Sequence, residues 1–227
     1  MQLTWNGHSN FLLQQDGVSF RIDPFFEGNP CAPTDCDLSE KVDAVLVTHD
    51  HGDHVGQSIE ICKETGAPLV GVFDTVNKLI EQGLPQDQGI GMNIGGSVEL
   101  AGVQIQMVQA MHSTASGVAA GYILTFPNGF CIYHAGDTGI FSSMQLFSFF
   151  HNIQVALLPI GGHFTMGPRQ AAFACKMLGC RKVVPMHWGT FPILEQNTDN
   201  FARQLKDAAP DTELIPMTPG STVTLNK

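Results

Sequence analysis

The sequence has few charged residues. Asp, Glu, Lys and Arg together make up 14% of its 227 residues, whereas soluble proteins average roughly 25%. Only 11 Lys and Arg stand against 21 Asp and Glu, which gives a net charge of −10. Phosphate backbones are held by clustered bases, so this composition predicts no binding of a nucleic-acid polymer. A shortage of charge is also typical of surface that a second subunit covers, and we expect a homo-oligomer.

Long apolar runs and paired cysteines are missing as well. No stretch of about 18 apolar residues occurs, so neither a transmembrane helix nor a membrane partner is predicted. The first eleven residues contain no basic segment followed by an apolar one, which predicts no secretory signal and a cytoplasmic location. The six Cys form no Cys-x-x-Cys pair, and we interpret them as reduced thiols. Histidine, with nine residues, is by contrast abundant.

Several catalytic signatures are also missing. Gly89-Ile90-Gly91 is followed by Ile94 where a dinucleotide-binding loop would need a third Gly. The sequence contains no Gly-x-x-x-x-Gly-Lys phosphate loop, no Gly-x-Ser-x-Gly elbow and no His-Glu-x-x-His zinc helix. These absences argue against the cofactor-dependent enzyme classes and leave the histidines as the chemically informative residues.

The pattern of strands and helices predicts an α/β fold. Asp16-Gly17 and Pro127-Asn128-Gly129 each separate two apolar runs and predict tight hairpins. Short continuous apolar runs, such as 44–47 and 155–158, are typical of strands covered on both faces. Further strands are expected at 69–73, 98–100, 103–108, 183–184, 214–215 and 222–225. Helices are expected at 55–65, 74–82, 168–178 and 198–209.

In each half of the chain, a run of strands is followed by alternating strands and helices. No low-complexity linker divides the two halves. We therefore expect a single domain over residues 1–227. Two sheets that face each other with helices outside would form a four-layered αββα sandwich. Residues 24–40, with three Pro and one Gly, are expected to form a loop.

The segment Thr48-His49-Asp50-His51-Gly52-Asp53-His54 directly follows a predicted buried strand. Side chains two residues apart in an extended segment project to the same side, so His49 and His51 can bind one ion. Gly52 permits a sharp turn that brings Asp53 and His54 to a neighbouring position at the start of the next helix. One short loop would thereby supply ligands to two adjacent metal ions.

Three more candidate ligands each follow a predicted strand: His112, Asp137 and His187. Ligands at the carboxyl ends of strands converge at one edge of a sandwich, where a cleft can form. A catalytic centre needs about three protein ligands per ion with one position open. Asp137 can bridge two cations through separate oxygens. Imidazole and carboxylate ligands predict two divalent ions, with Zn as the first choice and Mn, Fe or Ni as alternatives.

These motifs together resemble the metallo-β-lactamase superfamily. The run from His49 to His54 is followed by Met111-His112-Ser113, by His134-Ala135-Gly136-Asp137-Thr138 and by Met186-His187-Trp188. Gly7-His8-Ser9 and Gly162-His163-Phe164-Thr165-Met166-Gly167-Pro168 narrow the resemblance to a branch of small metal-dependent hydrolases. That branch is similar to ascorbate-6-phosphate lactonase and, more distantly, to a phospholipase D acting on N-acyl phosphatidylethanolamines. The resemblance implies the metallo-β-lactamase fold.

The resemblance also implies a role for each ligand. The first metal would be held by His49, His51 and His112. The second would be held by Asp53, His54 and His187, and Asp137 would bridge the two. The expected reaction is hydrolysis of a small ester, lactone or phosphoester by a bridging hydroxide, which two cations provide at neutral pH.

Other side chains would assist this reaction. Asp53 would orient the hydroxide or take its proton. His163 is the candidate general acid, because it follows a predicted strand end in a Gly-flanked loop facing the same edge. His8 and His134 are expected to donate hydrogen bonds that orient the ligands, and Thr165 to lie near the substrate.

Three alternative functions stay open: a phosphodiesterase or nuclease with the same centre, a non-catalytic metal-binding protein, and a redox protein with iron. The partner that we expect is a small-molecule substrate. Two divalent cations would make the cleft positive although the surface is acidic, so this substrate could be anionic. Loops 24–40 and 113–118 are expected to shape its specificity.

Overall fold

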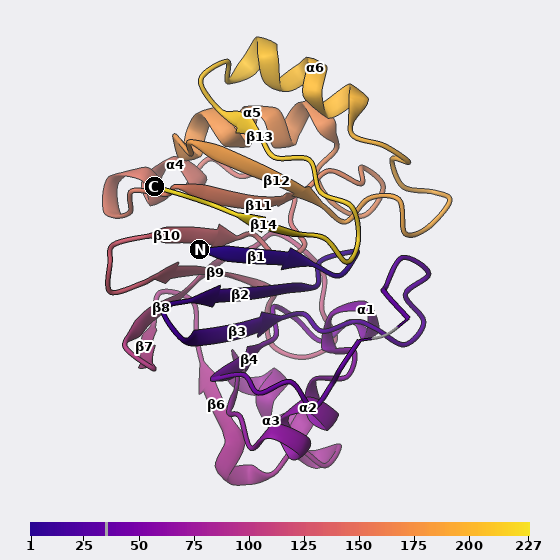
Figure 1. Ribbon diagram of the computed structural model, residues 1–227, viewed down its shortest axis with the longest axis vertical. Coiled ribbons are helices and arrows are strands. Elements are labelled where there is room, and N and C mark those ends of the chain that lie inside the picture. The colour runs from indigo at the N-terminus through magenta and orange to yellow at the C-terminus, as the bar shows by residue number, and fades with distance from the viewer. Residues whose placement is uncertain (35) are drawn as a thin grey trace.

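The computed structural model describes residues 1–34 and 36–227, and its strands form two seven-stranded sheets that face each other (Figure 1). The first sheet has the order β14-β1-β2-β3-β4-β5-β6 and contains β1 (Gln2–Trp5), β2 (Phe11–Gln15), β3 (Val18–Ile22), β4 (Ala44–Leu46), β5 (Leu69–Val72), β6 (Gly89–Met92) and β14 (Thr222–Thr224). The second has the order β13-β12-β11-β10-β9-β8-β7 and contains β7 (Ser97–Leu100), β8 (Val103–Gln109), β9 (Ala120–Thr125), β10 (Cys131–His134), β11 (Val155–Pro159), β12 (Lys182–Met186) and β13 (Glu213–Leu214).

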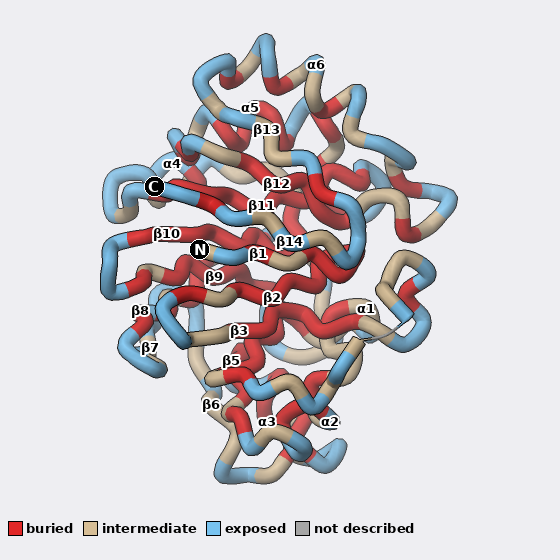
Figure 2. The backbone as a smooth tube through the Cα atoms, viewed as in Figure 1, coloured by how far each residue is buried: buried red, intermediate tan, exposed pale blue. Residues whose placement is uncertain are grey.

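The helices lie on the outer faces of the sheets. They are α1 (Gly52–Val55), α2 (Ser58–Thr65), α3 (Phe73–Glu81), α4 (Met144–Phe150), α5 (Pro168–Leu178) and α6 (Asp199–Ala208), with a 3-10 turn η1 (Gln86–Gln88). The helices α2 and α3 pack on the first sheet, whereas α5 packs on the second sheet between α4 and α6. Figure 2 shows the sheets buried and the outer layers more exposed. The predicted αββα sandwich is confirmed.

The strand β4 shows why an unbroken apolar run is needed at the middle of a sheet. Ala44 and Leu46 point into the core between the two sheets. Val45 and Val47 belong to the second apolar cluster, beneath α2 and α3. All four residues are fully buried. Since neighbouring side chains in a strand face opposite sides, a strand with both faces covered has no position for a polar residue.

Both predicted hairpins are present. Asp16 and Gly17 adopt φ angles of +53° and +83°, and they connect Gln15 to its partner Val18 across the β2–β3 pair. A turn with two left-handed residues matches the twist of the strands that it joins. In the β9–β10 connection, Gly129 takes a φ of +78° and donates a backbone hydrogen bond to Phe126.

The expected helix at 55–65 is interrupted, because α1 ends at Val55 and α2 begins at Ser58. Gly56 lies directly against the backbone of Pro24, and a Cβ there would collide with the carbonyl oxygen of Pro24. Gln57 then donates a backbone hydrogen bond of 2.9 Å to the same carbonyl. The interruption therefore fastens the segment after the His49–His54 motif to the loop that follows β3.

The strand directions bring several loops to one edge of the sandwich. β1 and β3 run parallel to β4 in the first sheet, and β8 and β10 run parallel to β11 and β12 in the second. In Figure 1, the arrowheads of β1 and β3 point to the side where α1 lies. Backbone hydrogen bonds from Ala120 to Thr48 and from His187 to His8, each 3.0 Å long, join the two sheets at this edge.

None of the helices in the described part of the chain has the length and apolar character needed to cross a membrane.

The two tyrosines of the chain give a matched pair of buried hydroxyl groups. Tyr122, on β9, donates a hydrogen bond of 2.7 Å to the carbonyl of Val47, just before the His49–His54 motif. Tyr133, on β10, is equally buried, but its hydroxyl has no hydrogen-bond partner among the described residues. Only the first hydroxyl therefore links the sheets.

We expect Tyr122→Phe to lower the free energy of unfolding by about 1–3 kcal/mol, because it leaves a buried carbonyl without its partner. Tyr133→Phe is the control and should leave the stability unchanged or raise it, since it removes an unpaired hydroxyl. Urea denaturation of both variants measures the difference. Equal losses in the two variants would contradict the linking role of Tyr122.

Candidate metal centre

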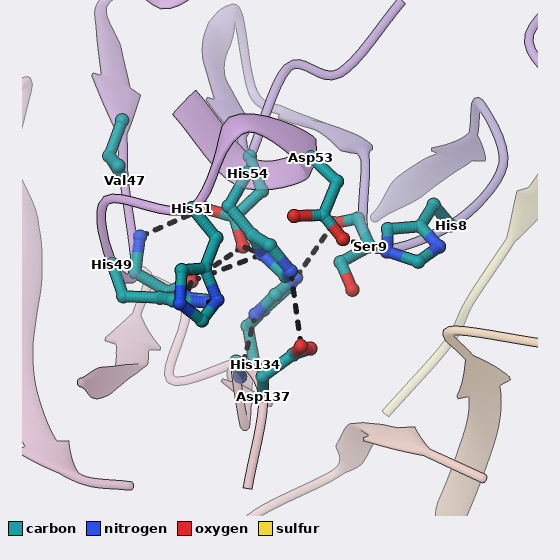
Figure 3. A network of polar contacts seen from close by, with 12 residues as sticks. His8, Ser9, Val47, His49, His51, Asp53, His54, His134 and Asp137 are labelled. Carbon is teal, nitrogen blue, oxygen red and sulfur yellow. Dashed lines mark hydrogen bonds and ion pairs between the residues drawn. The ribbon is translucent and has the colours of Figure 1, made fainter. Parts of the chain in front are cut away.

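Imidazole and carboxylate groups converge where the strands end. The motif after β4 supplies His49, His51, Asp53 and His54. In Figure 3 these side chains lie close together and close to Asp137. The structure places the predicted ligands in three overlapping groups, and within each group the ligand atoms lie within 4.8 Å of one another. Together the groups include all seven predicted ligands: His49, His51, Asp53, His54, His112, Asp137 and His187. These groups come from four different strand ends.

The first group consists of His49, His51 and His112. Nε2 of His49 lies 2.9 Å from Nδ1 of His51, as expected for side chains two residues apart in an extended segment. The ring centre of His112 lies 5.0 Å from that of His49 and 5.1 Å from that of His51. Three ring nitrogens on one side of an open position are the pattern of a catalytic zinc site.

The second group contains Asp53, His54 and His187 and, unexpectedly, His8. Asp137 lies between the two groups. Its Oδ2 is 3.0 Å from Nε2 of His187, 3.3 Å from Nε2 of His54 and 3.6 Å from Nε2 of His112. One carboxylate oxygen thus faces imidazoles of both groups.

The residues present fit a bound cation. The side chains of Asp137 and His54 are almost completely buried, yet among the described residues Oδ1 of Asp137 has no hydrogen-bond partner, and Nε2 of His54 has only the 3.3 Å approach to Oδ2 of Asp137. Buried polar atoms rarely remain without a partner, because their lost hydration is costly. Coordination of a cation would satisfy both atoms, and this nitrogen and oxygen donor set suits zinc and its neighbours.

The protonation states differ between the histidines. Burial, with the nearby His54, lowers the pKa of His49 to about 2, so this imidazole is neutral and ready to bind a cation. Burial acts in the same direction on His54, but the adjacent carboxylates of Asp137 and Asp23 raise its pKa well above 6.5. A cation that binds His54 would therefore have to compete with a proton for this imidazole.

Asp23 lies behind His54 and was not among the predicted site residues. Its Oδ2 lies 2.7 Å from Nδ1 of His54. The same carboxylate accepts hydrogen bonds from the backbone N–H of Thr48, at 2.8 Å, and from its hydroxyl, at 2.7 Å. A carboxylate behind a metal-binding histidine fixes the ring and its tautomer. The position of Asp23 directly after the buried strand β3 was the signal that sequence reasoning overlooked.

His8 connects the second group to the loop after His187. Its Nε2 lies 3.0 Å from Oδ2 of Asp53, and its Nδ1 lies 3.0 Å from the hydroxyl of Thr190. Burial lowers the pKa of His8 to about 4, which leaves the ring neutral. A neutral ring that donates to Asp53 accepts from Thr190. The predicted orienting role of His8 agrees with these contacts.

Backbone strain gathers at this edge. His8, Asp23 and His187 have φ angles of +56°, +47° and +56°, which side chains other than Gly rarely adopt. Such residues cost about 1–3 kcal/mol each and persist where the surroundings hold them. Here, the backbone N–H of His187 donates to the carbonyl of His8, and the indole N–H of Trp5 donates to the same oxygen.

Asp50 fixes the loop that follows His112 and was also not predicted as a site residue. Its carboxylate accepts hydrogen bonds from Thr114, Ala115 and Ser116 and pairs with Lys78 at 2.7 Å. Burial raises the pKa of Asp50, but the ammonium and the donors outweigh it and hold the pKa well below 3.8. The residue between two ligands therefore shapes loop 113–118, which the sequence had marked for specificity.

The remaining predicted residues lie in different settings. His134 is buried, and its ring nitrogens make hydrogen bonds of 3.0 and 3.1 Å with the backbone of Ser9 and Gly136, so it joins two loops beside the site. His163 is exposed in loop 161–167, where its ring contacts Phe164. Thr165 is buried in the same loop.

Comparison with known proteins gives consistent matches. A family model described as a beta-lactamase superfamily domain matches residues 19–188. A protein named UPF0173 metal-dependent hydrolase from Nitratidesulfovibrio vulgaris (strain DP4) is 59% identical, covering 100% of this chain and 96% of that protein. A protein of the same name from Pyrobaculum islandicum is 43% identical and covers 98% and 99%.

A solved structure is similar over the full length. Igni18, described as a novel metallo hydrolase from the hyperthermophilic archaeon Ignicoccus hospitalis, superimposes with a TM-score of 0.89. It is 39% identical in sequence, and the match covers 100% of this chain and 98% of that one.

The role of Asp23 can be tested by Asp23→Asn. Asn keeps the side-chain volume and tolerates a left-handed φ, so the fold should persist. The charge behind His54 is lost, and we expect metal affinity to fall about 10–100-fold. Competition with a chromogenic chelator measures this affinity. Asp16→Asn, in the exposed β2–β3 turn, is the control and should bind metal as the unaltered protein does. Equal affinities in the two variants would contradict the role of Asp23.

Proposed function

The chain belongs to the metal-dependent hydrolases of the beta-lactamase superfamily, and from this we propose that it uses two divalent cations to hydrolyse a small ester, lactone or phosphoester. Zinc is the first choice for these cations. The observation that supports a dinuclear centre most directly is the position of Asp137. Its Oδ2 lies within 3.6 Å of imidazole nitrogens from both ligand groups. His49, His51 and His112 would hold one cation, Asp53, His54 and His187 the other, and Asp137 both.

Two cations in such a centre lower the pKa of a water molecule from 15.7 to roughly 7 and stabilise negative charge that develops on the substrate. The protein must then orient the attacking group. Asp53 is suited to this because its side chain is 30% exposed, whereas Asp137 is buried. The hydrogen bond from His8 holds Oδ2 of Asp53 in place.

We propose His163 as the general acid that protonates the leaving group. Its loop is closed by a backbone hydrogen bond of 3.1 Å from Gly162 to Met166. One end of the loop is fixed beside Asp137, because Met166 donates a backbone hydrogen bond to Thr138. The other end, Gly161, lies against the backbone of His187. An imidazole on a short loop held by neighbours of two ligands can reach a leaving group at the rim of the centre.

The dinuclear centre predicts a metal content of about two ions per chain, and His51→Ala should bind about one. Chelation should abolish hydrolysis, and added zinc should restore it. Elemental analysis measures the metal, and turnover of p-nitrophenyl acetate, a lactone and bis-(p-nitrophenyl) phosphate measures the activity. The matched control is His151→Ala, since His151 caps α4 and contacts Gln106.

Each unfavourable outcome has a distinct meaning. Unchanged metal in His51→Ala would contradict the ligand assignment. Bound metal without turnover on any substrate would favour a non-catalytic metal-binding protein. Cleavage of the phosphodiester alone would favour a phosphodiesterase, and bound iron with oxygen consumption would favour a redox protein.

The general acid has its own test. His163→Ala should slow hydrolysis of an alkyl ester by about 10²–10⁴-fold, because a poor leaving group needs a proton. Hydrolysis of the matching p-nitrophenyl ester should change little, since its leaving group departs as an anion. Metal content should be unchanged. An equal loss of rate on both esters would exclude proton donation to the leaving group as the role of His163.

A further inference from the structure

The rim of the metal centre carries exposed apolar side chains on three separate loops. Met111, Phe164 and Ile193 are 54%, 54% and 56% exposed. Single apolar residues are common on protein surfaces, and they are informative only where they gather. Each of these three residues lies on a loop that is fastened beside a candidate ligand.

Thr138, the residue after the central ligand Asp137, holds the first two loops. Its hydroxyl accepts a hydrogen bond of 2.9 Å from the backbone N–H of Met111, next to the ligand His112. Its carbonyl accepts one of 2.9 Å from Met166, at the end of the loop that carries Phe164. Met111 and the loop that carries Phe164 are thus tied to the hydroxyl and the carbonyl of one residue beside the metal centre.

The third loop is fastened beside the ligand His187. Glu195, two residues after Ile193, donates a backbone hydrogen bond of 3.1 Å to the carbonyl of Gly161. Gly161 in turn lies so close to the carbonyl of His187 that a Cβ would collide with it. The loops that carry Phe164 and Ile193 therefore start from the same point, next to a ligand.

Basic side chains are missing from these loops. Residues 110–119, 138–143, 161–167 and 188–198 contain no Lys or Arg, and Glu195 is their single charged residue. Lys78 is engaged by Asp50 at 2.7 Å. Proteins recognise phosphate and carboxylate groups mainly with Arg and Lys. Along the chain, the base nearest to the rim is Arg169, which is exposed in the first turn of α5.

We propose that the substrate is an uncharged ester or lactone with an apolar group beside the scissile bond, and that Phe164, Met111 and Ile193 hold this group. The proposal rests on the hydrolase function above and names its substrate class. The cations attract the reacting oxygen of any substrate, so the rim decides which substrate binds well. An apolar rim selects by buried area, and affinity should then increase with the length of the apolar group.

Exposed Phe side chains elsewhere give a matched control. Phe149, on α4, is 75% exposed. In Figure 1, α4 and α1 lie on opposite sides of the molecule, so Phe149 is distant from the metal centre. Removal of either Phe takes an exposed apolar ring from the surface, but only Phe164 should affect the substrate.

The test uses the metal-loaded protein and alkyl hydroxamates from two to six carbons, which are uncharged at neutral pH and bind metals without being hydrolysed. Calorimetry measures their affinity, and kcat/KM is measured on p-nitrophenyl esters of the same lengths. We expect both to increase about twofold per methylene, somewhat less than full burial gives. Phe164→Ala should remove most of this dependence, whereas Phe149→Ala and Arg169→Ala should retain it.

Four outcomes decide the matter. No dependence on chain length in the unaltered protein would overturn the proposal. The proposal would also be overturned if the unaltered protein preferred the anionic ester p-nitrophenyl hydrogen succinate and Arg169→Ala abolished that preference, since this would indicate an anionic substrate. A changed sedimentation coefficient of Phe164→Ala, with chain-length dependence intact, would assign Phe164 to a subunit contact and also overturn it. Hydroxamates that bind by length without turnover of any ester would support the apolar rim and contradict the proposed hydrolysis.

Discussion

The structure depends on one constraint: several imidazoles and a carboxylate are gathered where some of their buried polar atoms have no partner among the described residues, and a bound cation would satisfy these atoms. Asp137 provides the negative charge, and its Oδ2 lies 3.0 to 3.6 Å from three ring nitrogens. Its other oxygen, Oδ1, is buried without a hydrogen bond among the described residues. An arrangement this costly is held by the rest of the fold. Two sheets whose strands end at the same edge hold it from both sides.

A second layer of hydrogen bonds holds the candidate ligands in position from behind. Asp23 holds His54 from behind, and His8 holds Asp53, while Asp50 holds the loop after His112. Asp23, His8 and His187 have left-handed backbone conformations, which persist only because the surrounding contacts hold them.

Local patterns in the sequence predicted the layers and the seven ligand candidates, because both follow from short-range rules. Alternating and continuous apolar runs set the strands, and the spacing of His49 and His51 needs only an extended segment. The supporting contacts escaped prediction because they join distant positions, such as Asp23 with His54 and Asp50 with Thr114. The interruption of the helix at Gly56 has the same origin, since it is caused by close contact with the backbone of Pro24 on another loop. The periodicity of a sequence does not show which distant residues come into contact.

The shortage of charged residues affects how a substrate would be selected at the centre. A surface with few bases cannot attract anions over a distance, and two cations at this edge would act only nearby, because salt screens fields beyond about 8–10 Å. Selection of the substrate must then occur by contact. The loops of Met111, Phe164 and Ile193 offer apolar area there and, Glu195 aside, no charge. The cations would thus serve the reacting bond, and the apolar loops would distinguish one substrate from another.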